Sequence, residues 1–141
     1  MRLVGLLACS LAATSAAPAA PPEGTAAAAV ARTYFSLLEQ RRYRAALRLR
    51  RNDMRLAAFV QAFRRYRDYR GAVGRPGTVE GAAGSLYVEV PVRVFGRLRG
   101  GGRFSERGSV TLRRVNDVDG SSAEARRWHI YRTDVRPYFR P

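Results

Sequence analysis

A run of alternating apolar residues constrains the fold of this chain more than any other feature. Aliphatic side chains occupy every second position of residues 86–94, namely Leu86, Val88, Val90, Val92 and Val94. A period of two is typical of a β-strand that has one face on a hydrophobic core. The residues between them include Tyr87, Glu89, Arg93 and, one step further, Phe95. We therefore expect these four side chains on the opposite face of the sheet.

A turn and further strands accompany this run. The consecutive glycines at 100–102 indicate a turn. In residues 104–115, Phe104, Val110 and Leu112 share one parity, which favours a second strand. Residues 128–132 are typical of a closing strand, and residues 78–80 of a short strand that precedes the long one. We therefore predict one antiparallel sheet of about four strands.

Apolar residues at helical spacing precede the predicted sheet. Thr25 is the predicted N-cap of a helix of about 17 residues. The arginines at 41–42 mark its C-terminal end, where cations complement the helix dipole. A short second helix begins at Tyr43, and Asp53 is the predicted cap of a third helix whose apolar stripe continues to Tyr66. Helices followed by an antiparallel sheet indicate an α+β fold, in which one sheet face buries the helical stripes.

The N-terminal segment is typical of an export signal. Residues 1–20 combine an early positive charge, an apolar run and small residues that offer cleavage sites. The segment Leu6-Leu7-Ala8-Cys9 resembles the bacterial lipobox, whose cysteine receives a diacylglycerol. Two interpretations stay open: lipidation of Cys9, which would anchor the protein to a membrane, or a cleaved signal that discards Cys9. Both predict an exported, periplasmic protein with a linker over 21–24, one domain over 25–135 and a C-terminal tail over 136–141.

The charge of the chain favours anionic partners. The formal net charge is +15 over 141 residues, and the sequence contains Arg but no Lys. The absence of Lys indicates a coding bias toward Arg, so the net charge is a weaker argument for nucleic-acid binding than its size suggests. The positive field still favours phospholipid headgroups, lipopolysaccharide or another envelope polyanion. Because export separates the chain from nucleic acid, we expect no nucleic-acid partner.

Most of the expected polyanion contacts lie on the predicted helices. The relevant arginines are Arg41, Arg42, Arg44, Arg48, Arg50, Arg51, Arg64, Arg65, Arg67 and Arg70, with Tyr43, Tyr66 and Tyr69 between them. This mixture suits lipid headgroups and single-stranded nucleic acid, and it is also typical of a solvated helical face. The basic, glycine-rich segment 97–103 favours a hairpin tip over a phosphate-binding loop, because its glycines open no helix.

The order of these elements resembles a known superfamily. The resemblance is carried by Tyr34-Phe35-x-x-Leu38, by Tyr43 with Ala46, by Tyr87-Val88-Glu89-Val90-Pro91-Val92 and by Trp128-His129-Ile130. This pattern is similar to the nuclear-transport-factor-like superfamily, a cystatin-like α+β roll also used by ketosteroid isomerases and polyketide cyclases. The resemblance implies a sheet curled around a pocket between sheet and helices. We expect a small apolar ligand in that pocket, lined by some of Tyr34, Phe35, Phe59, Phe63, Tyr87, Phe95, Phe104 and Trp128.

These features favour a non-catalytic binding or accessory module of the bacterial cell envelope. One alternative is a small isomerase or cyclase-like enzyme that uses His129 or an acidic residue as its base. Alternation places His129 opposite Trp128 and Ile130, toward solvent or a groove. The other alternative is a structural protein that forms a homodimer or contacts a polyanion. The motifs indicate no metal or organic cofactor, since 116–120 is typical of a turn and lacks the remaining ligands of a calcium loop.

Overall fold

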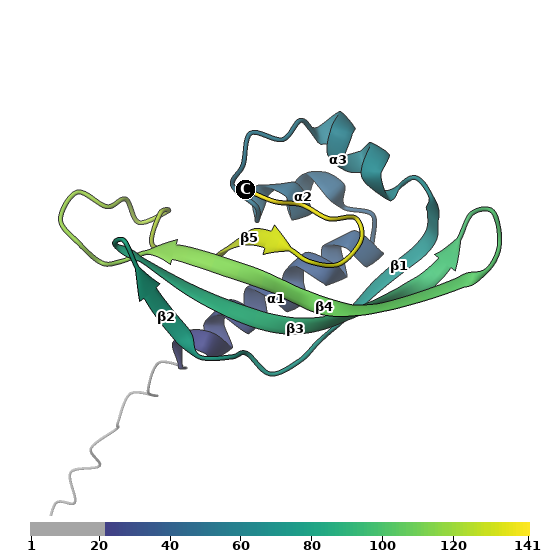
Figure 1. Cartoon of the computed structure of the whole chain (residues 1–141). Coiled ribbons are helices and arrows are strands. Elements are labelled where there is room, and N and C mark those ends of the chain that lie inside the picture. Colours follow the sequence, from purple (N-terminus) through teal and green to yellow (C-terminus); the bar gives the residue numbers. More distant parts are fainter. Residues whose placement is uncertain (1–21) are drawn as a thin grey trace, which may run out of the picture.

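The computed structural model describes residues 22–141, in which three helices precede five strands. The elements are α1 (Glu23–Glu39), α2 (Tyr43–Arg48), α3 (Leu56–Phe63), β1 (Tyr66–Val73), β2 (Val79–Ala82), β3 (Ser85–Leu98), β4 (Arg103–Val115) and β5 (His129–Thr133). The strands form one curled antiparallel sheet, and the helices lie together on one of its faces (Figure 1). The predicted α+β class is confirmed, with the sheet curled into a half-barrel.

The long strand β3 is the centre of the sheet. The strand order is β1-β3-β4-β5, and β2 pairs with the beginning of β3. On one edge of β3, β2 pairs with Ser85–Val88 and β1 with Val92–Leu98, so these two strands follow one another along the same edge. The other edge pairs with β4 over the whole length of β3. The alternating run at 86–94 thus forms the strand with which β1, β2 and β4 all pair.

The predicted facing of β3 is confirmed. Val88, Val90, Val92 and Val94 are at most 4% exposed, whereas Glu89 and Arg93 on the other face are exposed. We call the valine face, which the helices cover, the inner face, and the opposite face the outer face. The inner face is closed by α1, whose buried small residues are Ala27, Ala28 and Ala31.

The third helix is shorter than predicted. Its stripe was expected to continue to Tyr66, but α3 ends at Phe63 and Tyr66 begins β1. Tyr66 and Tyr69 are each 6% exposed, so both are buried, although they lie in a strand and not in a helix. Pairing with the far end of β3 satisfies the backbone of this segment and overrides the local helical spacing.

The first helix begins before the predicted cap. Thr25 was the expected N-cap, but Glu23 and Gly24, assigned to the linker, already lie in the first turn of α1. Pro22 occupies the N-cap position, and the carboxylate of Glu23 binds the Arg114 guanidinium of β4 at 2.6 Å. A carboxylate in the first turn also interacts favourably with the helix dipole. The ion pair therefore fixes the start of α1 against the sheet.

Candidate functional site

The eight aromatic residues expected to line one pocket lie on both sides of the sheet. Tyr34, Phe59 and Phe63 are buried between helices and sheet, where the ring centres of Phe59 and Phe63 are 5.2 Å apart. Tyr87 and Phe95 belong to the outer face of β3, on the other side of the sheet. Trp128 is 9% exposed, and the centre of its ring lies 5.6 Å from the guanidinium carbon of Arg114. Helix-side and outer-face residues therefore cannot share one pocket.

His129, the candidate base, is buried beside two arginines. It lies directly across from Arg113 of β4 and so occupies the face opposite Trp128 and Ile130, as alternation predicts. Only 9% of it is exposed, and its Nδ1 has no hydrogen-bond partner among residues 22–141. Burial lowers the pKa of His129, and the charges of Arg51 and Arg113 lower it further, while a hydrogen bond to the backbone of Arg127 opposes them. The imidazole is therefore neutral at pH 7.

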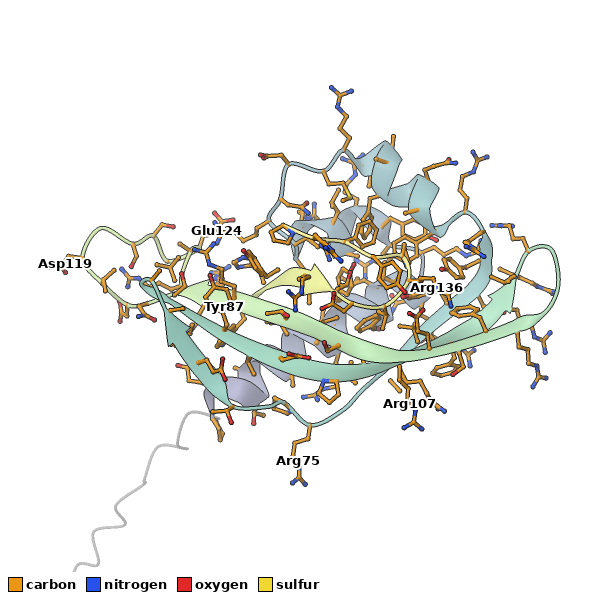
Figure 2. The ribbon with its side chains drawn as sticks, in the orientation of Figure 1. Arg75, Tyr87, Arg107, Asp119, Glu124 and Arg136 are labelled. Carbon is orange, nitrogen blue, oxygen red and sulfur yellow. The ribbon has the colours of Figure 1, made fainter. Side chains whose placement is uncertain are left out.

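The outer face carries arginines in directly opposed pairs. In the antiparallel register of β3 and β4, Arg93 lies across from Arg107, and Arg97 lies across from Arg103. All four side chains are exposed. Figure 2 shows Arg107 projecting from the face of the sheet that lies away from the helices. Two like-charged cross-strand pairs thus stand on the same face, with the pair Phe95 and Ser105 between them.

Three of these four arginines, all except Arg107, border a hollow of about 550 Å³ on the outer face. Its lining comprises Asp68, Arg70, Arg93, Phe95, Gly96, Arg97, Arg103, Phe104 and Ser105. The guanidinium carbon of Arg93 lies 5.0 Å from the centre of the Phe95 ring, which holds the charge over a half-buried aromatic surface. Arg70 pairs with Glu39 of α1 at 3.0 Å. The ion pairs within residues 22–141 include none of Arg93, Arg97, Arg103 and Arg107.

A second basic hollow, of about 460 Å³, adjoins the first at the β3–β4 turn. The two hollows share Arg97 and Arg103, and the second adds Arg67 and Arg99. The predicted hairpin tip is confirmed: Gly101 and Gly102 adopt φ angles of +91° and +83°, which glycine tolerates best. Arg99 ties the tip to the segment between α3 and β1, because its Nε donates to the carbonyl of Arg64 at 2.8 Å. We call the two adjoining hollows the outer arginine site.

Six of the ten arginines expected on helices are divided between two surfaces. Arg67 and Arg70 belong to β1 and face the outer arginine site. Arg41, Arg42, Arg44 and Arg48 remain around α2, where they line a hollow of about 410 Å³ with Tyr43. Of the three interleaved tyrosines, Tyr66 and Tyr69 are buried, so neither ring is free to stack on a nucleic-acid base.

The acidic loop between β4 and β5 is a turn, as predicted. Gly120 has a φ of +85°, and Asp117 pairs with Arg126 at 2.7 Å. Within residues 22–141, no three His, Cys, Asp or Glu side chains lie close enough together to hold a metal ion. In the same range, no helix has both the length and the apolar character needed to span a membrane. The lipidation candidate Cys9 lies outside the described residues.

The outer arginine site was missed at the sequence level, although its signal is present. A turn centred on Gly100 pairs Arg97 with Arg103 and Arg93 with Arg107, and all four share the outward parity of β3 and β4. The register of the hairpin shows which charged residues lie across from one another, as it does for apolar residues, and it would have predicted the site. No protein-family model, curated protein or solved structure matches the chain.

Proposed function

We propose that the chain is a non-catalytic binding module of the nuclear-transport-factor-like kind, and that its outer arginine site binds the phosphate groups of an anionic membrane surface. This proposal rests on one observation: two arginine pairs lie directly across from each other on β3 and β4, Arg93 with Arg107 and Arg97 with Arg103. The order of three helices and a curled antiparallel sheet supports the assignment to this superfamily.

Opposed arginines favour an anion because they repel one another in its absence. Like charges directly across an antiparallel pair destabilise a sheet. A phosphate between two guanidinium groups removes this repulsion and accepts charge-assisted, bidentate hydrogen bonds from them. The arginines of both opposed pairs form no ion pair within residues 22–141, although Asp68 lies across from Arg97 on the other edge of β3. One carboxylate does not balance four guanidinium groups, so the face keeps a positive charge until an anion binds.

The shape of the site favours a surface over a single small anion. The arginines extend from the sheet centre to the β3–β4 turn, and the site has one acidic residue, Asp68, in its lining. Several headgroups of a bilayer can contact such a row at once, each arginine near the surface contributing about 1 kcal/mol. The expected export signal, with or without lipid on Cys9, is consistent with a membrane-facing role.

The enzyme alternative has less support. A base must reach the proton that it abstracts. His129 is buried beside Arg51 and Arg113, and it lies across the sheet from the buried aromatic residues Tyr34, Phe59 and Phe63. A substrate held among those aromatic residues would therefore be separated from His129 by the sheet.

Vesicle co-sedimentation tests the membrane proposal. The full chain with Cys9→Ala, which prevents lipidation, is mixed with phosphatidylcholine vesicles that do or do not contain phosphatidylglycerol. We expect binding only to the anionic vesicles and a steep loss of binding as salt is added. Replacing Arg93, Arg97 and Arg103 with Gln should weaken binding about 100-fold, from about 1 kcal/mol per arginine.

A charge-matched variant separates the site from net charge. Arg44, Arg48 and Arg55 are exposed on the helix side of the molecule, and their replacement with Gln removes the same charge. This control should bind anionic vesicles nearly as well as the parent chain. If both triple variants lose affinity equally, net charge alone drives binding and the site assignment is wrong. If the parent binds single-stranded DNA more tightly than anionic vesicles at the same salt, the membrane assignment is wrong.

A further inference from the structure

An arginine is buried in the core without a partner for its charge. Arg50, just after α2, is 2% exposed, although arginine is rarely buried unless it is paired. None of its Nε, Nη1 and Nη2 atoms makes a hydrogen bond within residues 22–141. The ion pairs of that range do not include it, and no Asp or Glu precedes Glu23 in the sequence. Within residues 22–141 the guanidinium thus has its donors available for an anion.

The neighbours of this guanidinium are aromatic. Its central carbon lies 4.8 Å from the centre of the Phe139 ring. The hydroxyl group of Tyr34 is also near: burial raises the pKa of this phenol, and the charge of Arg50 and a weak side-chain contact with it oppose the rise, but the two groups do not reach hydrogen-bonding geometry. A neutral phenol and an aromatic ring are weak partners for a buried cation. A carboxylate would satisfy the guanidinium fork through two parallel hydrogen bonds.

The ring that covers Arg50 comes from the C-terminal segment, which we define as residues 134–141. Phe139 is 7% exposed and packs among the rings of Phe59 and Phe63, with centre distances of 5.3 and 6.0 Å. It is held there by a short bridge to Thr133 at the end of β5. The ring therefore occupies an aromatic site that is built by α3 and Arg50 but filled by the end of the chain.

The other anchors of this segment are polar, except for Val135, which is 1% exposed in the core. Glu106 of β4 accepts hydrogen bonds from the Arg136 Nε and the Tyr138 hydroxyl, both at 2.9 Å. The Tyr69 hydroxyl donates to the carbonyl of Arg136 at 2.8 Å. Figure 2 shows Arg136 on the helix side of the sheet, where the C-terminal segment bends after β5. Because Asp134 is hydrogen-bonded to the backbone of β4 and Val135 is buried, the part that can detach is residues 136–141, which these contacts, the Phe139 ring and its bridge to Thr133 hold in place.

We propose that Arg50 is the anion-binding residue of a site for small apolar monocarboxylates, and that Phe139 closes this site. The ligand's apolar group takes the place of the Phe139 ring, and its carboxylate binds the guanidinium. A single buried cation matches a monoanion, whereas a phosphate dianion would leave excess negative charge among aromatic rings. This site lies on the helix side of the sheet and does not depend on the outer arginine site.

Binding of phenylacetate to the full chain with Cys9→Ala tests the proposal. The readout is the Arg50 side-chain Nε–Hε signal in ¹H–¹⁵N spectra, together with saturation-transfer signals of the probe. Phe139→Ala should bind phenylacetate about tenfold more tightly than the parent, because it removes the occupant that competes with the ligand. Glu106→Gln loosens the segment but keeps the ring, and it should shift the affinity in the same direction.

Two controls identify the role of the charge. In the Phe139→Ala background, Arg50→Met should abolish binding of phenylacetate, whereas Arg48→Met, at the exposed last position of α2, should leave it unchanged. Phenylacetamide, which has the same shape without the charge, should not bind. Equal binding of phenylacetate and phenylacetamide, or binding that survives Arg50→Met, would mean an apolar cavity without an anion site. No binding to either Phe139→Ala or Glu106→Gln, with both folded by circular dichroism, would overturn the proposal.

Discussion

The guanidinium of Arg50 and the ring of Phe139 face one another at 4.8 Å in the protein core. A desolvated cation–π contact contributes about 2 kcal/mol. Burying an ion in a protein costs several kcal/mol, which is more than this contact returns. The pair is therefore a source of instability in the unliganded protein, in keeping with a residue that serves binding.

Replacing this arginine should stabilise the protein. Arg50→Met keeps most of the side-chain volume and removes the unpaired charge, so we expect the free energy of unfolding to rise by about 1–2 kcal/mol. Urea denaturation followed by circular dichroism measures it. Arg48→Met, at an exposed position, should change it by less than about 0.5 kcal/mol. A loss of stability in Arg50→Met alone would show that the buried guanidinium has a partner.

Gly71 of β1 should tolerate no side chain. A Cβ at this position would overlap the ring of Phe35, which is buried on α1 at 2% exposure. Because neither the strand nor the ring can move freely, Gly71→Ala should destabilise the fold by about 1–3 kcal/mol. At Gly81 in β2 the nearest atom to a new Cβ is the Leu86 Cδ2 at 3.8 Å, so Gly81→Ala is the matched control. If Gly71→Ala and Gly81→Ala unfold at the same temperature, this packing of α1 on β1 is wrong.

The alternation at 86–94 predicted β3 correctly because a period of two is a local signal of a half-buried strand. The first strand had no such signal. Phe59, Phe63 and Tyr66 follow helical spacing, and the chain becomes strand at Tyr66 because the far edge of β3 is free to pair there. This pairing depends on contacts that are distant in sequence, which periodicity within one segment does not contain.

The two proposed sites differ in how far the sequence determines them. The opposed arginines of the outer arginine site follow from one turn and the parity of its two strands, so they can be predicted from residues 93–107 alone. Burial of Arg50 follows from the position of Phe139, which returns from the end of the chain to cover it. The spacing of residues around α2 indicates only that Arg50 is one of many arginines on a helical face.

Reversing one charge in the outer arginine site should raise stability and lower membrane binding. Arg103→Glu turns the opposed pair with Arg97 into an attractive one, which should add about 0.5–1 kcal/mol to the free energy of unfolding at low salt. The gain should shrink as salt screens the charges. The same variant should bind anionic vesicles more weakly than Arg103→Gln. If Arg103→Glu is more stable than the parent but binds anionic vesicles equally well, the repulsion between Arg97 and Arg103 does not serve membrane binding.

The anchor of the C-terminal segment should weaken in acid. Burial raises the pKa of Glu106, but hydrogen bonds from Arg136 and Tyr138 outweigh it and hold the pKa below its ordinary value. The stabilisation is therefore complete above pH about 4.5 and is lost as the pH falls below it. At pH 7, Glu106→Gln should cost about 1 kcal/mol, and the difference from the parent should vanish in acid. The exposed Glu89→Gln is the control, and it should unfold like the parent at both pH values.

The single histidine should make stability depend on pH between 5 and 8. Burial, aided by Arg51 and Arg113, keeps the pKa of His129 below 6.5, so the unfolded chain takes up this proton at a higher pH than the folded chain does. Stability is then greatest above pH 6.5 and falls as the pH drops through that value toward the lower, folded pKa. Urea denaturation across this range should show the decline in the parent and a flat profile in His129→Gln. Because His129 is the only histidine, its ring proton signals report the folded pKa directly, and a midpoint above 6.5 would contradict this account.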